Sequence, residues 1–146
     1  MKISDVMSGS PELCTIQDSV LDCAQLMAQR DIGMVPICES RDTRRLVGCL
    51  TDRDIVVRVV AEQKDYNLNV SEVMSTNAIT VRPEDDVEHA RELMEEHQIR
   101  RLMVVDEHGS LVGVVATADL ARSIEEEEVG ETLEAISQPA PTLNTK

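Results

Sequence analysis

The segment Thr51-Asp52-Arg53-Asp54 holds the residue types in this chain that are best suited to contact a small ligand. Thr51 follows an apolar stretch and Asp54 comes three residues later, which is the capping-box pattern of a helix N-terminus. The same geometry can serve a ligand, because the free N–H groups of a helix N-terminus attract a phosphate. A carboxylate one turn into the helix can also accept hydrogen bonds from both hydroxyls of a ribose. The two interpretations are compatible, so Thr51, Arg53 and Asp54 are candidate ligand contacts.

A second copy of this pattern is incomplete. Asp119 follows the apolar stretch Leu111–Val115, but the residue three positions before it is Ala116, which has no hydroxyl. Thr117 stands one residue too late to form the same box. We therefore expect a second site at Asp119 to be weak, altered or empty.

The charge balance limits the classes of partner. The chain has 28 acidic and 14 basic residues, a formal charge of −14, which argues against binding to nucleic acid or to an anionic membrane. An anionic ligand therefore needs local cations. Arg100 and Arg101 precede the apolar stretch Leu102–Val105 and are candidates. The alternative is a solvated helix end, where the helix dipole favours positive charge.

Aromatic residues are almost absent, since Tyr66 is the only one in 146 residues. A planar base would have to lie between aliphatic side chains. Ile16, Val35 and Ile37 are candidates for these contacts, and packing in the core explains the same residues equally well. The core itself must be aliphatic.

We find no pattern for catalysis or for a metal. The sequence has no G-x-S-x-G, no P-loop and no recognisable nucleophile–histidine arrangement, so we predict that the protein is not an enzyme. None of the four cysteines lies in a C-x-x-C, and their spacing fits no zinc site. We also see no secretory signal and no apolar run long enough to cross a bilayer, so we expect a soluble, cytoplasmic protein.

An internal repeat organises the chain. Residues 4–8 (SDVMS) recur as 71–75 (SEVMS), a shift of 67, and residues 46–48 (LVG) recur as 111–113, a shift of 65. The difference of two residues falls in a turn between Cys38 and Leu46, where a change of length costs little. The chain is therefore a duplicated unit in which Asp119 is the counterpart of Asp54.

Each unit is predicted to be β-α-β-β-α, which gives an α/β (α+β) fold. The periodicities predict strands near 13–16 and 78–81, helices from Val20 and Val87, hairpins of 34–38 with 46–50 and 102–105 with 111–115, and closing helices from about Asp52 and Thr117. One unit of roughly 55 residues buries too little surface alone, so two should pack sheet to sheet with pseudo-twofold symmetry. We divide the chain into 1–66, 67–125, and an acidic helix with a disordered tail over 126–146.

The duplicated unit resembles a pair of CBS (cystathionine β-synthase) domains, often called a Bateman module. The resemblance rests on the D-V-M-S and E-V-M-S openings, on I-G-M-V-P-I at 32–37, and on the segments 48–55 and 113–120, and it covers about residues 1–125. It implies that an adenine nucleotide (AMP, ADP or ATP) binds in the cleft between the repeats. It also implies that Thr51 and Asp54 contact the ribose and phosphate, and that the segment holding Arg100 and Arg101 lines the cleft. No tightly bound prosthetic group is expected.

Two functions follow from these observations. The first is a stand-alone regulatory sensor that binds an adenine nucleotide, forms a homodimer and signals to a partner protein. The second is a redox-responsive or protein-interaction module whose nucleotide site has degenerated, which the missing hydroxyl at Ala116 and the four cysteines favour. In a CBS unit Cys14 and Cys38 fall on neighbouring strands, so we also consider a redox-sensitive bridge between them.

Overall fold

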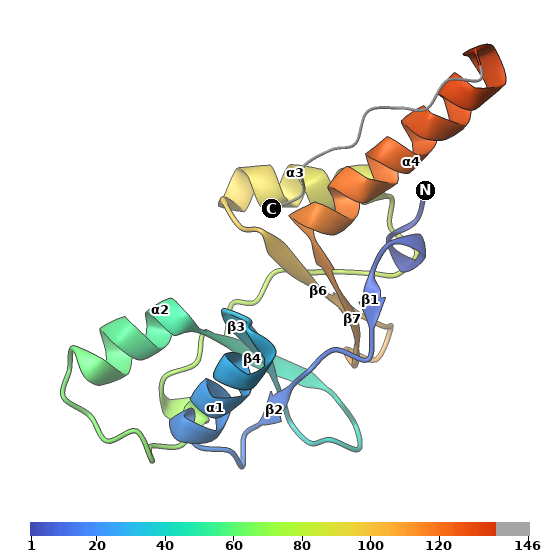
Figure 1. Cartoon of the computed structure of the whole chain (residues 1–146). Coiled ribbons are helices and arrows are strands. Elements are labelled where there is room, and N and C mark those ends of the chain that lie inside the picture. Colours follow the sequence, from blue (N-terminus) through green and yellow to red (C-terminus); the bar gives the residue numbers. More distant parts are fainter. Residues whose placement is uncertain (137–146) are drawn as a thin grey trace.

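The computed structural model describes residues 1–136, with side chains described for residues 1–126. The first repeat has the predicted order β-α-β-β-α (Figure 1). Its elements are β2 (Cys14–Thr15), α1 (Val20–Arg30), β3 (Met34–Cys38), β4 (Leu46–Thr51) and α2 (Asp52–Ile55), which continues as a π-helical segment, η2 (Val56–Val60). The sheet order is β2-β3-β4, with β2 parallel and β4 antiparallel to β3.

The second repeat has the same order, which confirms the duplication. Its elements are β5 (Thr80–Val81), α3 (Val87–His97), β6 (Arg101–Val105), β7 (Leu111–Ala116) and α4 (Thr117–Ile136). The acidic helix predicted near the C-terminus is not a separate element, because α4 runs through it without a break. The tail predicted to be disordered lies, from residue 137 onward, outside the described residues.

The two segments that precede the repeats are exchanged between them. The N-terminal segment contains a 3-10 turn, η1 (Ile3–Asp5), and the short strand β1 (Ser8–Gly9), which pairs with β7 of the second repeat (Figure 1). Ile3 is fully buried in the core of that repeat. In the linker, the 3-10 turn η3 (Val70–Glu72) buries Val70 in the core of the first repeat. Each repeat is thus completed by the segment that precedes the other one.

Glycine permits this close approach of the exchanged segments. A Cβ atom at Gly48 would lie 2.6 Å from the carbonyl oxygen of Ser75, and one at Gly113 would lie 2.9 Å from that of Ser8. Contacts this short are not available to a side chain, so only glycine fits at these two equivalent positions of β4 and β7.

The strands β3 and β6 are buried on both faces. One face packs in the core of its own repeat, and the other contributes to a cluster between the two sheets. Val35 and Ile37 of β3 are fully buried against α1, and Leu102 and Val104 of β6 occupy the equivalent place in the second repeat. A third cluster joins the two sheets and contains Leu13, Cys38, Met103 and Leu111. This cluster is the sheet-to-sheet packing that the sequence predicts.

The cysteines do not form the bridge considered above. β2 and β3 are neighbours, but Cys14 is in register with Ile37 and belongs to the core of the first repeat, whereas Cys38 belongs to the cluster between the sheets. The two side chains therefore point to opposite faces, and all four cysteines are free. Burial raises the pKa of the Cys38 thiol to about 11, and it also raises the pKa of Cys49.

In the described part of the chain, we find no helix whose length and apolar character would let it cross a membrane.

Candidate ligand-binding site

A pocket of about 280 Å³ lies where the two repeats and the N-terminal segment meet. Its walls come from β1 and the segment after it, from β3 and the residues just before it in the first repeat, and from β6, β7 and α4 in the second. The lining residues are Ser8, Pro11, Glu12, Ile32, Met34, Pro36, Arg101, Val114, Ala116 and Asp119. The volume is close to the lower end of the usual range for small-molecule pockets, about 300 Å³.

The apolar walls come from alternate strand residues. Met34 and Pro36 face the pocket, whereas Val35 between them faces the core, because successive side chains of a strand point to opposite faces. Val114 and Ala116 of β7 alternate in the same way with the buried Val115. The walls are therefore aliphatic and neutral, which suits a flat apolar group.

The polar end of the pocket centres on Asp119, in the first turn of α4. Asp119 is 8% exposed, and its Oδ2 accepts a hydrogen bond from the backbone N–H of Ala116 at 2.8 Å. Its Oδ1 is paired with the guanidinium of Arg122, which is one turn further along the helix. The carboxylate is therefore fixed in orientation, and one of its oxygens is held by a partner that is itself half exposed.

A further cation, the exposed Arg101, lines the same pocket as this carboxylate. Arg101 is the first residue of β6 and is in register with Ala116 of β7, so both side chains belong to the same face of the sheet. Ser8 adds a hydroxyl, and Glu12 is engaged by Arg30 at 3.1 Å. The pocket thus combines an acceptor, a donor cation and apolar walls, an arrangement able to hold a molecule with hydroxyls, a flat apolar part and an anionic group.

Two of the candidates from the sequence, Arg101 and Asp119, line this pocket. Thr51, Arg53 and Asp54 do not. The predicted capping box is confirmed, since Thr51 Oγ1 accepts from the Asp54 N–H at 3.1 Å and Asp54 Oδ2 accepts from the Thr51 N–H at 3.0 Å. Asp54 also lies 3.9 Å from the guanidinium of Arg58, which donates to the Val73 carbonyl at 3.0 Å.

The aliphatic candidates Ile16, Val35 and Ile37 do not line this pocket. Val35 and Ile37 are 0% exposed in the core and have no surface to offer a ligand. Ile16 packs partly against the same core, and its carbonyl accepts a hydrogen bond from the side chain of Asn69. The residues of β3 that border the pocket are Met34 and Pro36.

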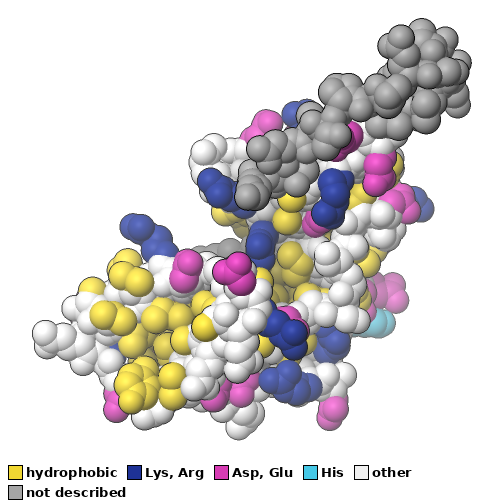
Figure 2. All heavy atoms as spheres, in the orientation of Figure 1, with side chains coloured by type: hydrophobic (Ala, Val, Ile, Leu, Met, Phe, Trp, Pro, Cys, Tyr) yellow, Lys and Arg dark blue, Asp and Glu magenta, His cyan; other side chains and the backbone are white. Residues whose placement is uncertain are grey.

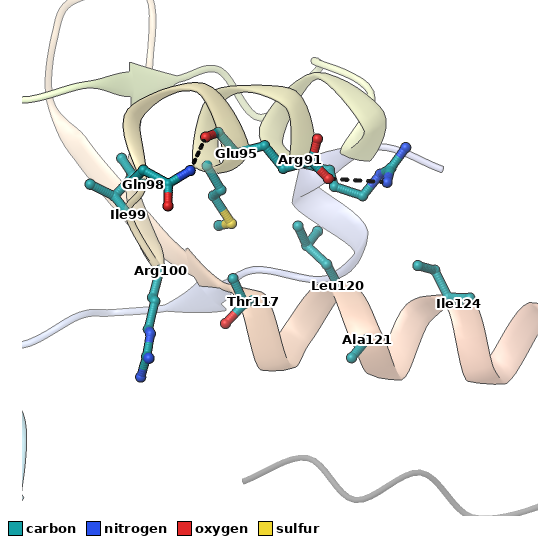
Figure 3. A pocket seen from close by; sticks show the side chains of 10 residues that line it. Arg91, Glu95, Gln98, Ile99, Arg100, Thr117, Leu120, Ala121 and Ile124 are labelled. Atoms are coloured by element: carbon teal, nitrogen blue, oxygen red, sulfur yellow. Dashed lines mark hydrogen bonds and ion pairs between the residues drawn. The ribbon is translucent and has the colours of Figure 1, made fainter.

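Arg100 belongs to a different depression. A larger groove of about 550 Å³ runs between α3 and α4 on the outside of the second repeat (Figure 3). Leu120 points toward α3 and forms part of its floor, whereas Arg100 extends away from α3. At the rim, Arg91 is engaged by Glu88 and Glu95. Arg100 and Arg101 are thus divided between two sites, because adjacent residues entering a strand point in opposite directions.

Several pocket residues were not identified from the sequence. Ser8, Pro11 and Glu12 are far from β7 in the chain and come to it only through the exchange of the N-terminal segment. The recurrence of residues 4–8 at 71–75 was the available signal that these segments have equivalent structural roles. Among the described residues, no group of three or more His, Cys, Asp or Glu side chains is arranged to hold a metal ion.

Comparison with known proteins gives consistent results for sequence and structure. The model of the CBS domain family matches the chain twice, over residues 3–61 and 70–126. YhcV, a CBS domain-containing protein of Bacillus subtilis, is 39% identical over 92% of this chain and 94% of its own length. Hypoxic response protein 1 of Mycobacterium tuberculosis is 36% identical over 92% of this chain and 93% of its own length.

Two solved structures have the same arrangement of elements. A crystal structure of Hypoxic Response Protein I with two coordinated zinc ions gives a TM-score of 0.75 at 35% identity, covering 84% of this chain and 98% of that one. The CBS domain protein PAE2072 from Pyrobaculum aerophilum, complexed with AMP, also gives a TM-score of 0.75. Its identity is 30%, and the match covers 87% of this chain and 97% of that one.

Proposed function

This chain belongs to the CBS domain family, and we propose that it is a regulatory module that binds an adenine nucleotide in the pocket bearing Asp119 and Arg101. The observation that carries the proposal is a nearly buried carboxylate in the first turn of α4, facing an aliphatic pocket between the repeats. The AMP complex of PAE2072, a protein with the same fold, supports the choice of ligand class.

Each part of the nucleotide has a suitable counterpart in the pocket. Asp119 accepts hydrogen bonds from the ribose hydroxyls, which displace Arg122 from Oδ1. The adenine lies between Met34, Pro36 and Val114, and Arg101 attracts the phosphate. Aliphatic walls give less stacking energy than aromatic ones, so we expect the modest affinity of a sensor for an abundant nucleotide.

The site at Thr51 and Asp54 in the first repeat is proposed as a second, related site. Its capping box is complete, and Thr51 adds a hydroxyl that Ala116 lacks. Met34 is in register with Thr51 across β3 and β4 and also lines the pocket at Asp119, so the two sites share a wall. Occupation of one should therefore affect the other.

The output of the module is a change of conformation or assembly. Ligand that contacts both repeats favours the orientation of the repeats in which it binds best, and a partner protein can recognise that orientation. We propose a homodimer that acts in the cytoplasm and has no catalytic activity of its own.

Isothermal titration calorimetry of the full chain with AMP, ADP, ATP and S-adenosylmethionine tests the proposal. We expect at least one of these ligands to bind, and we expect Asp119→Asn to weaken its binding at least tenfold. The side-chain oxygen of the Asn can still accept the hydrogen bond from the Ala116 N–H, so the start of α4 is preserved. Asp54→Asn is the matched variant, because it makes the same change at the equivalent position. Absence of binding at millimolar concentration, or binding that both variants leave unchanged, would contradict the proposal.

A further inference from the structure

Two cysteines of the first repeat contact each other in its core. Cys14 lies on β2 and Cys23 lies on the neighbouring helix α1, and a hydrogen bond joins their side chains (Figure 1). Both belong to the core cluster of this repeat, where Cys14 is 3% exposed and Cys23 is 0% exposed. Only eight residues separate them in the chain, so the two thiols form a local pair.

The connection from β2 to α1 is fixed at both ends. Asp18 Oδ2 accepts a hydrogen bond from the Thr15 N–H at 2.8 Å, which closes the turn after β2. Ser19 and Asp22 form the capping box that begins α1, with hydrogen bonds of 2.9 and 3.1 Å. The contact between the two thiols is therefore set by the local structure of this segment.

The second repeat shows that the fold does not require thiols at these positions. With the shift of 67 that relates the repeats, Val81 is the counterpart of Cys14 and Ala90 is the counterpart of Cys23. Val81 is 2% exposed and Ala90 is 0% exposed, and both belong to the core of the second repeat. A valine and an alanine satisfy the packing, so the paired thiols add chemistry that the fold does not need.

The two thiols differ in acidity. The hydrogen bond that Cys23 donates holds the pKa of the Cys14 thiol below its ordinary value, with a smaller contribution in the same direction from the positive charge of Arg41. Burial and the carboxylates of Asp18 and Asp22 oppose this shift without reversing it. The same hydrogen bond, together with burial, raises the pKa of Cys23. Because the thiolate is the form that attacks a disulfide, Cys14 is the nucleophile of the pair.

Cys14 is also the easier of the two to reach. Its strand β2 is two residues long and lies at the edge of the sheet β2-β3-β4. Separation of this short strand from β3 exposes the Cys14 sulfur while α1 and β3 remain folded. Figure 2 shows a largely hydrophobic surface over α1. A small neutral reagent is not repelled there, whereas an anionic reagent is repelled by a chain with a formal charge of −14.

We propose that Cys14 and Cys23 are a redox-active pair, which low-molecular-weight disulfides oxidise to an intramolecular disulfide. The Cys14 thiolate attacks the small disulfide, forms a mixed disulfide with it and releases one thiol molecule. The Cys23 sulfur then attacks the Cys14 sulfur and releases the second thiol molecule. The protein loses two electrons and two protons, and the small disulfide is reduced to two thiols. This inference goes beyond the proposed function and does not depend on nucleotide binding.

The new bond would tie one wall of the ligand pocket to α1. Pro11 and Glu12 line that pocket shortly before β2, and Glu12 lies 3.1 Å from Arg30 at the end of α1. A bond between Cys14 and Cys23 adds a covalent connection near the start of the same helix, so oxidation restricts the segment that carries the two pocket residues. The bond also restricts the unfolded chain, which stabilises the oxidised protein.

Mass spectrometry of the full chain after treatment with hydroxyethyl disulfide, a small neutral molecule, tests the pair. We expect two of the four thiols to resist alkylation in denaturant, with the mass lowered by two hydrogen atoms. Trypsin should then release residues 3–30 as one unalkylated peptide, because no Lys or Arg lies between Lys2 and Arg30. Cleavage before Asp18 and Asp22 should leave its two cysteine fragments joined until a reductant is added. The oxidised chain should also unfold at a urea concentration about 1 M higher than the reduced chain.

Two variants separate the steps of the reaction. Cys23→Ala removes the second thiol, so the reaction should stop at a mixed disulfide on Cys14. The double variant Cys14→Val, Cys23→Ala has the residue pair of the second repeat, so it should fold, as circular dichroism can verify. Its two remaining thiols, Cys38 and Cys49, should both be alkylated after the same treatment. Four alkylated thiols in the unaltered chain, or a bridge that includes Cys38 or Cys49, would overturn the inference.

Discussion

Asp119 accepts a hydrogen bond from the Ala116 N–H at 2.8 Å, just as Asp54 accepts one from the Thr51 N–H at 3.0 Å. In the first repeat the bond is reciprocated, because Thr51 Oγ1 accepts from the Asp54 N–H. Ala116 has no side-chain acceptor for the Asp119 N–H. Half of the capping box therefore persists in the second repeat, and it is the half that fixes the carboxylate.

Ala116→Thr should complete this box. The new hydroxyl can accept from the Asp119 N–H, so we expect the free energy of unfolding to rise by about 1 kcal/mol, the usual contribution of an N-cap side chain. Urea unfolding followed by circular dichroism measures the change. Thr51→Ala is the reverse change at the equivalent position and should lower the free energy of unfolding by a similar amount. Equal stability of all three proteins would show that neither box contributes.

Arg122 is expected to compete with a ribose for Asp119. Its guanidinium occupies Oδ1, so a ligand that binds this carboxylate through its hydroxyls must displace it. Arg122→Gln should therefore increase the affinity for adenosine several-fold. Adenosine is the appropriate probe because it has no phosphate and does not respond to the loss of a positive charge. A weaker affinity in this variant would mean that Arg122 contacts the ligand directly.

Much of the fold was predictable because its signals are local. Apolar spacing located α1 and α3, the two hairpins and the start of both closing helices, and the repeat linked Asp119 to Asp54. The faces of β3 were not predictable in the same way. Its residues 34–38 are almost uniformly apolar, because one side packs under α1 and the other borders the pocket and the second sheet. Without alternation of polar residues, the sequence does not indicate which face is which.

The exchange of the segments before each repeat was also beyond local patterns. The repeat shows that residues 4–8 and 71–75 are equivalent, but it is compatible with each segment packing on its own repeat or on the other. The choice depends on contacts between residues distant in the chain, such as Ser8 with Val114. Ser8, Pro11 and Glu12 were missed as pocket residues for this reason.

Ile3→Ala should test the exchange directly. Ile3 is 0% exposed in the core of the second repeat, so its truncation should lower the free energy of unfolding by about 2–5 kcal/mol, as for other buried aliphatic residues. Val70→Ala makes the equivalent change in the core of the first repeat. Ser4→Ala, at the exposed residue next to Ile3, should have little effect. If Ile3→Ala proves as mild as Ser4→Ala in urea unfolding, the N-terminal segment does not pack on the second repeat in solution.

Stability should fall at alkaline pH through Cys38. Burial raises the pKa of its thiol from 9.0 to about 11, so between these values the unfolded chain loses a proton that the folded chain keeps. The contribution is fully present below pH 9 and is lost as the pH rises toward 11, by about 1.4 kcal/mol for each pH unit.

Urea unfolding in reducing buffer at pH 7 and pH 10.5 should reveal this loss, and the comparison needs a variant because other groups also titrate there. Cys38→Ala removes the thiol, so its stability at pH 7 should be lower but should fall less steeply toward pH 10.5. The difference between the two slopes isolates Cys38 from Cys49, whose raised pKa contributes equally to both proteins. Parallel slopes would mean that the Cys38 thiol is accessible to hydroxide in the folded protein, in conflict with its position between the two sheets.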